Sequence, residues 1–362
     1  MVPNLMHRSF GTELPEQCPS PRHQGTETRA QLFAGDQGAA AAWPVFMFNW
    51  RLLASVTGVV AAGLMATKFY IRPSGYVIVF AIAALYWQFG VHNARSAARS
   101  NPKVSYCLIA IAQMILAVSV MTTLTYLAMS TDLPLKDASL LAWDRAFGLD
   151  FRGYLQFVNT HPSIMRVLAP CYSSINWQML AVVLLLPFTR QYQRCAEFIC
   201  AFTLALIATT CISTLVPAIG VYHILSLHPS DYPNFVPQGY YDTLRDAPLV
   251  RAGSLHGLSL LQLGGILTFP SFHAVSAVLY VWAFWPMSRL RWLVVPWNLA
   301  MIAATPLGGG HYFVDVLAGV LVASTAICAA LGISNLLRPT DPTLCQPMRN
   351  CWAGQRAKVW AD

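Results

Sequence analysis

The sequence has few charged residues. Asp, Glu, Lys and Arg make up 10% of its 362 residues, whereas a soluble domain has about 25%. The mean hydropathy is +0.49, and the apolar residues fall in runs of about 20, the length that a helix needs to cross a hydrocarbon core. These features exclude an ordinary soluble protein and predict an all-α polytopic membrane protein.

The sequence also lacks any recognisable cysteine motif. Its nine cysteines form no CxxC pair and no zinc spacing. Most of them lie in apolar runs, where a cysteine usually acts as a small buried apolar residue. We therefore assign them no function. A signal peptide is not expected either, because no basic segment precedes an apolar core and a cleavage site.

The chain contains eight apolar segments between two polar tails. The tails are residues 1–43 and 335–362, both expected to be cytoplasmic, the first of them flexible. Residues 44–103 would add two transmembrane helices to a six-helix domain at 104–334. The eight segments are 52–71, 75–92, 104–130, 164–188, 195–220, 264–285, 291–309 and 312–334.

The distribution of charge predicts the orientation. Eight crossings place both tails on one side, which carries 15 basic and 7 acidic residues, whereas the other side carries 8 of each. Basic residues are enriched on the cytoplasmic side, so we expect both termini there, in the plasma (inner) membrane. The net charge of +8 then reflects topology and anionic lipid, and no nucleic-acid partner is implied.

Two connections on the far side are long. Residues 131–163 mix aromatic and charged side chains and predict a helix in the membrane interface, where Asp144 and Arg145 would help to build a substrate entrance. Residues 221–262 are too polar to span the membrane, and long loops are often functional. Their aromatic side chains are expected to form a lid that excludes water: Tyr232, Phe235, Tyr240 and Tyr241.

Two short motifs carry the chemistry. One is FPSFHA, residues 269–274, and the other is TPLGGGHYFVD, residues 305–315. The predicted topology brings His273 and His311 to the same face of the membrane. Asp315 follows His311 by four residues, a spacing that places two side chains in contact on a helix. A carboxylate inside an apolar span usually marks function.

This set of side chains suits phosphoryl transfer. A neutral imidazole can attack phosphorus when a carboxylate holds its other ring nitrogen, and a second imidazole can act as general acid and base. Ser271 resembles a helix start, and Gly309 and Gly310 would leave backbone N–H groups open for an anion. The alternatives are structural histidines, or a facial triad that binds iron.

At these residues the sequence resembles the type-2 phosphatidic acid phosphatase superfamily, and most closely the branch of inositol phosphorylceramide synthase and its bacterial relatives. The family elements P-S-x-H and H-Y-x-x-D match residues 270–273 and 311–315. The resemblance implies a six-helix catalytic core over residues 104–334. The histidine mechanism that the resemblance implies needs no metal or other cofactor.

The resemblance also implies individual roles. His311 would be the nucleophile that forms a phosphohistidine, Asp315 would orient it, and His273 would be the general acid and base. Ser271 would help to bind phosphate. The acceptor would be a lipid or sugar alcohol in a transferase and water in a phosphatase, and the sequence does not identify the lipid or its head group.

The sequence departs from the phosphatase pattern in its cations. It has no K-x6-R-P element and no Arg shortly before His311, which fits the synthase-like branch. Arg245 and Arg251 are the predicted substitutes, because arginine binds phosphate in bidentate fashion. A phosphotransferase is therefore expected. A lipid phosphatase, a haloperoxidase-like enzyme of the same fold and a non-catalytic membrane scaffold are the alternatives.

Overall fold

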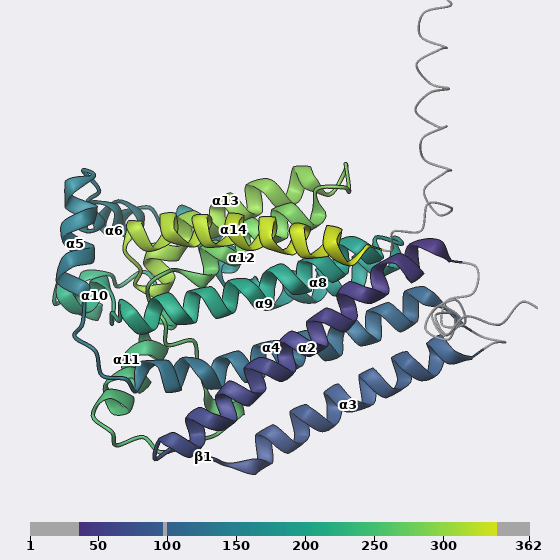
Figure 1. Ribbon diagram of the computed structural model, residues 1–362. Coiled ribbons are helices and arrows are strands. Elements are labelled where there is room, and N and C mark those ends of the chain that lie inside the picture. The colour runs from purple at the N-terminus through teal and green to yellow at the C-terminus, as the bar shows by residue number, and fades with distance from the viewer. Residues whose placement is uncertain (1–35, 97–99, 339–362) are drawn as a thin grey trace, which may run out of the picture.

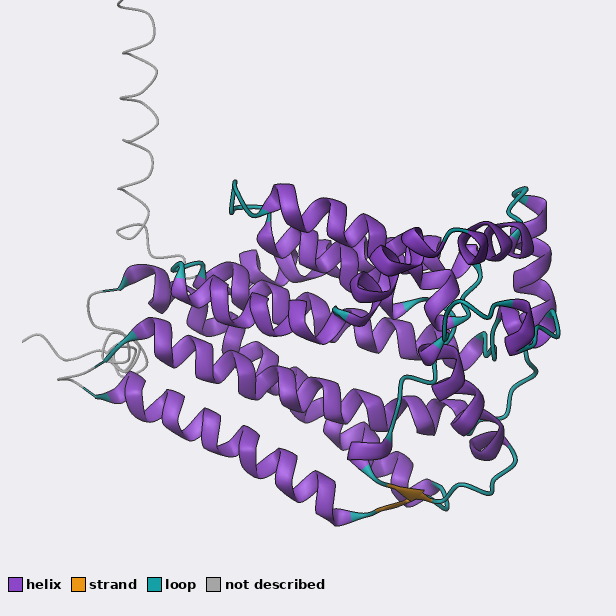
Figure 2. Cartoon of the chain, turned by 180° about the vertical axis from the view of Figure 1, so that it is seen from behind, coloured by secondary structure: helices purple, strands orange, loops and turns teal. Residues whose placement is uncertain are grey.

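The computed structural model describes residues 36–96 and 100–338, and this part of the chain is an elongated helical bundle (Figures 1 and 2). The all-α polytopic fold is confirmed. The helices are α2 (Gln37–Ala66), α3 (Pro73–Arg95), α4 (Pro102–Met129), α5 (Asp137–Ala146), α6 (Phe151–Thr160), α7 (Pro162–Ser173), α8 (Ile175–Phe188), α9 (Tyr192–Leu215), α10 (Val221–Ile224), α11 (Gln238–Arg251), α12 (Phe272–Phe284), α13 (Arg291–Gly309) and α14 (Phe313–Leu337). Short elements complete the fold: β1 (Tyr70–Ile71), β2 (Gly257–Leu258), and the 3₁₀ helices η1 (Pro229–Asp231) and η2 (Leu260–Gln262).

Within the described residues, six helices are long and apolar enough to cross a membrane: α2, α3, α4, α9, α13 and α14. The helices α7 and α8 are bent by 51° at the break between them, and only together are they long and apolar enough for a seventh span. The remaining apolar segment, the sixth in the sequence, contains α12, which has only 13 residues. All eight apolar segments of the sequence therefore contain helices, but they do not all cross as simple rods.

Two segment boundaries differ from the prediction. The first described helix, α2, begins at Gln37, inside the predicted tail, so Arg51 lies within α2 and not at its start. Residues 38–43 are small or apolar and extend the helix despite Pro44. The sixth segment was predicted from residue 264, yet α12 begins at Phe272 because residues 264–271 form an extended approach to it.

Local capping fixes several helix starts. The side chains of Asp36, Asn101 and Asp150 accept hydrogen bonds from the first backbone N–H groups of α2, α4 and α6. Proline at the first position assists α3, α4 and α7, because its fixed φ suits a helix start. These residues explain why the apolar runs begin as helices where they do.

The bundle has two different ends. The described chain begins and finishes at one end, where α2 starts and α14 stops, whereas α5, α10 and α11 gather at the other (Figure 1). At this second end β1 pairs in parallel with β2 and ties the α2–α3 connection to the segment after α11. Helix α9 packs against α2, α4, α12 and α14, which places it at the centre of the molecule.

Candidate active site

The turn between α13 and α14 positions His311. Gly310 has φ of 68°, a left-handed conformation that glycine adopts without strain. The backbone N–H groups of Gly310 and His311 both donate to the carbonyl oxygen of Pro306, and Gly309 is the last residue of α13. The predicted anion site of open glycine N–H groups is therefore wrong for Gly310, because the N–H group of Gly310 is used to close the last turn of α13.

His311 and Asp315 form the predicted pair. The ring Nδ1 of His311 lies 3.3 Å from Oδ2 of Asp315, and the backbone N–H of Tyr312 donates to the same oxygen at 2.9 Å. Asp315 is fully buried, and His311 is 4% exposed. With Nδ1 occupied by the carboxylate, Nε2 is the ring nitrogen of His311 that remains available to a ligand.

Helix α5 supplies two buried carboxylates that hold this turn from outside. Asp144 accepts hydrogen bonds from the backbone N–H groups of Phe313 and Val314, each at 2.9 Å, and so caps α14 from another helix. Asp137 accepts the hydroxyl of Tyr312 at 2.8 Å. Burial raises the pKa of Asp144 above its usual value, although the two backbone hydrogen bonds act against this shift.

Asp137 also fixes a neighbouring loop. Its carboxylate accepts the backbone N–H groups of Ile219 and Gly220, and the carbonyl of Gly310 accepts the N–H of Val221 at 2.8 Å. Helix α5, the α9–α10 loop and the turn before α14 thus form one hydrogen-bonded unit. Asp144 was predicted to help build a substrate entrance, whereas its observed contacts support the turn that carries His311.

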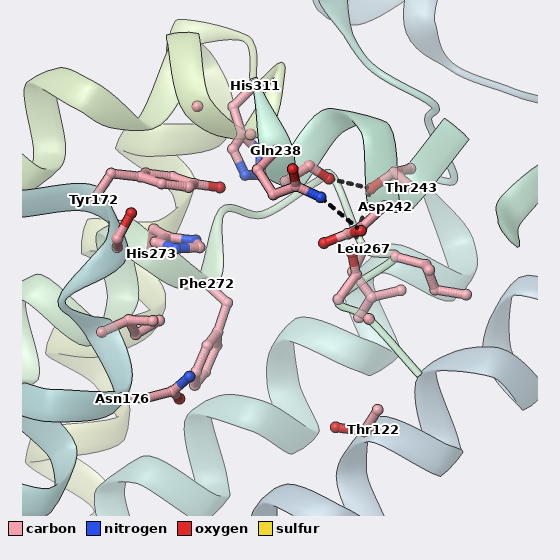
Figure 3. Close-up of a pocket in the computed structure, with 18 of the residues that line it drawn as sticks. Thr122, Tyr172, Asn176, Gln238, Asp242, Thr243, Leu267, Phe272, His273 and His311 are labelled. Carbon is pink, nitrogen blue, oxygen red and sulfur yellow. Dashed lines mark hydrogen bonds between the residues drawn. The ribbon is translucent and has the colours of Figure 1, made fainter. Parts of the chain in front are cut away.

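His273 lies on the first turn of α12, close to the same turn. The backbone N–H of Ser271 donates to the carbonyl of Asp315 at 3.0 Å, which locks the starts of α12 and α14 together. The ring of His273 stacks on Tyr172 of α7, with centroids 3.9 Å apart and planes at 8° (Figure 3). Sequence reasoning missed Tyr172, because only tertiary packing brings α7 against α12.

A cavity of about 510 Å³ joins these side chains. His273, His311 and Gly309 line it, together with Tyr172 and, from α11, Asp242. The rest of the lining is largely apolar and comes mainly from α4, α7, α8, α9 and the segment 264–267. Among the described residues that line the cavity, none is Lys or Arg, and Asp242 is the one carboxylate. The cavity therefore offers two imidazoles and a separate anionic group.

Three other predicted ligands lie outside the lining. Ser271 is fully buried, and its hydroxyl oxygen caps α12 by accepting from the N–H of Ala274. Arg245 pairs with Asp246 at 2.7 Å. Arg251 pairs with Asp132 at 2.8 Å. The structure thus gives each of these residues a different contact, and their role in phosphate binding stays a prediction.

The aromatic residues of the 221–262 segment also differ from the prediction. Tyr232 and Tyr240 are buried and pack on Tyr222, with Phe235 and Tyr241 stacked on them. None of these rings lines the cavity. The segment does cover the cavity, but through Val236 and polar residues of α11.

The iron-triad alternative needs three ligands that converge on one point. Asp315 is hydrogen-bonded to the ring of His311 and does not line the cavity. Within residues 36–96 and 100–338, no group of three or more His, Cys, Asp or Glu side chains is arranged to hold a metal ion. Instead, Asp315 holds the imidazole of His311 at a cavity that His273 also lines.

Comparison with known proteins supports the family resemblance. A family model described as the PAP2 superfamily matches residues 138–329, which include both histidine motifs. No curated protein and no solved structure matches the chain significantly. The match begins within α5 and ends within α14. The chain therefore belongs to the PAP2 superfamily, an assignment that supports a lipid-related function of the phosphatase or phosphotransferase type.

Proposed function

We propose that this protein is a membrane phosphotransferase that acts on lipid-linked phosphodiester head groups through a phosphohistidine on His311. The observation that carries the proposal is the hydrogen bond between His311 Nδ1 and Asp315 Oδ2. It leaves Nε2 as the nucleophilic nitrogen of a residue that lines the same cavity as His273. The branch that contains inositol phosphorylceramide synthase performs chemistry of this kind.

The reaction would take place in two steps. In the first step, Nε2 of His311 attacks phosphorus, the bond from phosphorus to the leaving alcohol oxygen breaks, and a protonated His273 gives that oxygen its proton. Asp315 stabilises the positive charge that develops on His311. In the second step, His273 takes the proton of an acceptor hydroxyl, whose oxygen attacks phosphorus and breaks the phosphorus–nitrogen bond.

The charge of the cavity favours a diester over a monoester. A phosphate monoester carries nearly two negative charges near neutral pH, and a site that binds it tightly needs several cations. No described Lys or Arg lines this cavity, whereas Asp242 does. A phosphodiester carries a single negative charge and is repelled less by the carboxylate. The absence of Lys and Arg from the described lining therefore favours transfer between alcohols over release of inorganic phosphate.

The second candidate function is a lipid phosphate phosphatase, which the superfamily also includes. To separate the two, the purified protein is given phosphatidic acid and phosphatidylinositol, each with and without a lipid alcohol acceptor. We expect turnover of phosphatidylinositol that depends on the acceptor. Rapid release of inorganic phosphate from phosphatidic acid, with no turnover of the diester, would make the protein a phosphatase instead.

A further inference from the structure

Helix α11 packs directly on the turn that carries His311. At Gly239 of α11, an added Cβ would lie 3.1 Å from the carbonyl oxygen of Gly308 and 3.3 Å from Cα of Gly309. Both glycines belong to the last turn of α13, just before His311. The close approach fixes the distance between α11 and the proposed nucleophile.

Asp242 follows Gly239 by three residues on the same face of α11 and lines the cavity (Figure 3). Three residues rise about 4.5 Å along a helix, so its carboxylate lies roughly one turn beyond the contact with the His311 turn. A six-carbon polyol attached to a phosphate is comparable in size to that separation. Its hydroxyl groups would reach Asp242 while the phosphorus lies at His311.

The carboxylate of Asp242 is held in place but not fully occupied. Its Oδ1 accepts from Nε2 of Gln238 at 3.2 Å and from Arg245 at 3.4 Å. Among the described residues, no hydrogen bond is formed by its Oδ2. Gln238 also lines the cavity, so an amide and a carboxylate lie side by side at its wall. This pair can accept hydrogen bonds from hydroxyl groups and donate one in return.

The surroundings favour hydroxyl groups over an ammonium group. Recognition of a quaternary ammonium typically uses several aromatic faces. The aromatic pairs of α11 are formed by Tyr240 and Tyr241, which do not line the cavity, and Tyr172 already stacks one of its faces on His273. Arg245 also supplies positive charge beside the carboxylate. A neutral, hydrogen-bonding ligand suits this environment better than a second cation.

We infer that Asp242 and Gln238 form a subsite that binds the hydroxyl groups of a polyol, as the head group of the phosphodiester donor. This inference rests on the proposed function, because it places the phosphorus of the donor at His311. Asp242 acts as a specificity-determining residue and takes no part in the proton transfers.

The test compares Asp242→Ala and Asp242→Asn with wild-type enzyme on phosphatidylinositol, phosphatidylethanolamine and phosphatidic acid. A hydrogen bond to a charged group contributes enough for a loss of about 10- to 100-fold. We expect Asp242→Ala to lower kcat/KM for phosphatidylinositol relative to phosphatidic acid by that factor, mainly through KM. Asp242→Asn should lose less, because its amide still bonds to hydroxyls. Asp231→Asn, an exposed carboxylate of the same connection that does not line the cavity, is the matched control.

The outcomes separate this inference from the proposed function. Equal losses on phosphatidylinositol and phosphatidic acid in Asp242→Ala would overturn the subsite, because a structural role affects all substrates. A selective loss on phosphatidylethanolamine, equal in the Ala and Asn variants, would identify an ammonium site and also overturn it. If wild-type enzyme turns over no phosphodiester at all, the proposed function fails first, independently of Asp242.

Discussion

At the scale of single residues, the three glycines before His311 have distinct physical roles. A Cβ at Gly308 would lie 2.9 Å from the ring of Tyr172, and one at Gly309 would collide with the ring of His311. Gly310 adopts the left-handed conformation that closes α13. The glycines therefore allow a tyrosine and a histidine to approach the backbone, where the sequence alone indicated an anion nest.

We predict that Gly309→Ala lowers kcat by about 100-fold, because a displacement of about 1 Å at a reacting group can have that effect. The added methyl group can be accommodated only if the imidazole of His311 moves. Gly332→Ala is the matched control, since a Cβ there meets nothing within 4 Å. Kinetics of both purified variants provide the measurement, and near-normal kcat for Gly309→Ala would show that the observed ring position is not required.

At the scale of elements, α5 supports the turn that carries His311. Its carboxylates at Asp137 and Asp144 are both buried and lie seven residues apart, two helical turns on one face. One binds the hydroxyl of Tyr312 and the other caps the backbone of α14. A helix that sequence reasoning assigned to the lipid interface thus determines where the HYFVD motif begins.

We predict that Asp144→Asn lowers kcat about tenfold with little change in KM. The amide presents one acceptor and one donor group to two backbone N–H groups, so one hydrogen bond is lost and α14 starts less rigidly. Asp150→Asn is the control, because the side chain of Asp150 caps α6 at the backbone N–H of Arg152 and forms no hydrogen bond with the described residues of the motif. Equal kcat in the two variants would contradict a positioning role for Asp144.

Much of the element pattern could be predicted from hydropathy. All eight apolar segments contain helices, because apolar length is a direct physical requirement for spanning lipid. The predicted start of the first span was wrong because residues 38–42 are glycine and alanine and lie shortly before Pro44, a combination that also occurs in loops. The shortness of α12 was missed because the apolar residues before it are extended and packed in the core.

The site was predictable where chemistry is local in sequence. His311 and Asp315 are four residues apart, so helix geometry alone predicts their contact, and the family motif adds His273. Tyr172 and Asp242 could not be found in this way, because they lie on α7 and α11 and only packing brings them to the cavity. Arg245 pairs with Asp242 and Asp246, which lie three residues before it and directly after it, so these partners were already visible in the sequence.

At the scale of the whole molecule, the two ends of the bundle differ in chemistry. The described termini lie at one end, and α5, α10 and α11 lie at the other (Figure 1). Which end faces the cytoplasm is a prediction from the distribution of basic residues. Arg51 lies inside α2, so it no longer counts among the basic residues of the predicted cytoplasmic side. The predicted excess of basic residues on that side is therefore smaller by one.

We predict that Ser230→Cys is labelled by an impermeant thiol reagent in intact cells and that Ser288→Cys is not. Both serines are exposed, and they lie in the 221–262 connection and in the α12–α13 connection. The native cysteines are replaced first, so that only the introduced thiol reacts. Labelling of Ser288→Cys alone would reverse the topology and place the site on the cytoplasmic face.

The central claim is that phosphorus becomes bonded to His311. The direct measurement gives purified protein a phosphatidylinositol with radiolabelled phosphorus, without acceptor, and then quenches the reaction with denaturant. We predict label on the protein that survives alkali and is released by acid, as expected for a phosphorus–nitrogen bond, and that is absent from His311→Ala. Label that persists in His311→Ala, or near-normal turnover by that variant, would contradict the phosphohistidine mechanism.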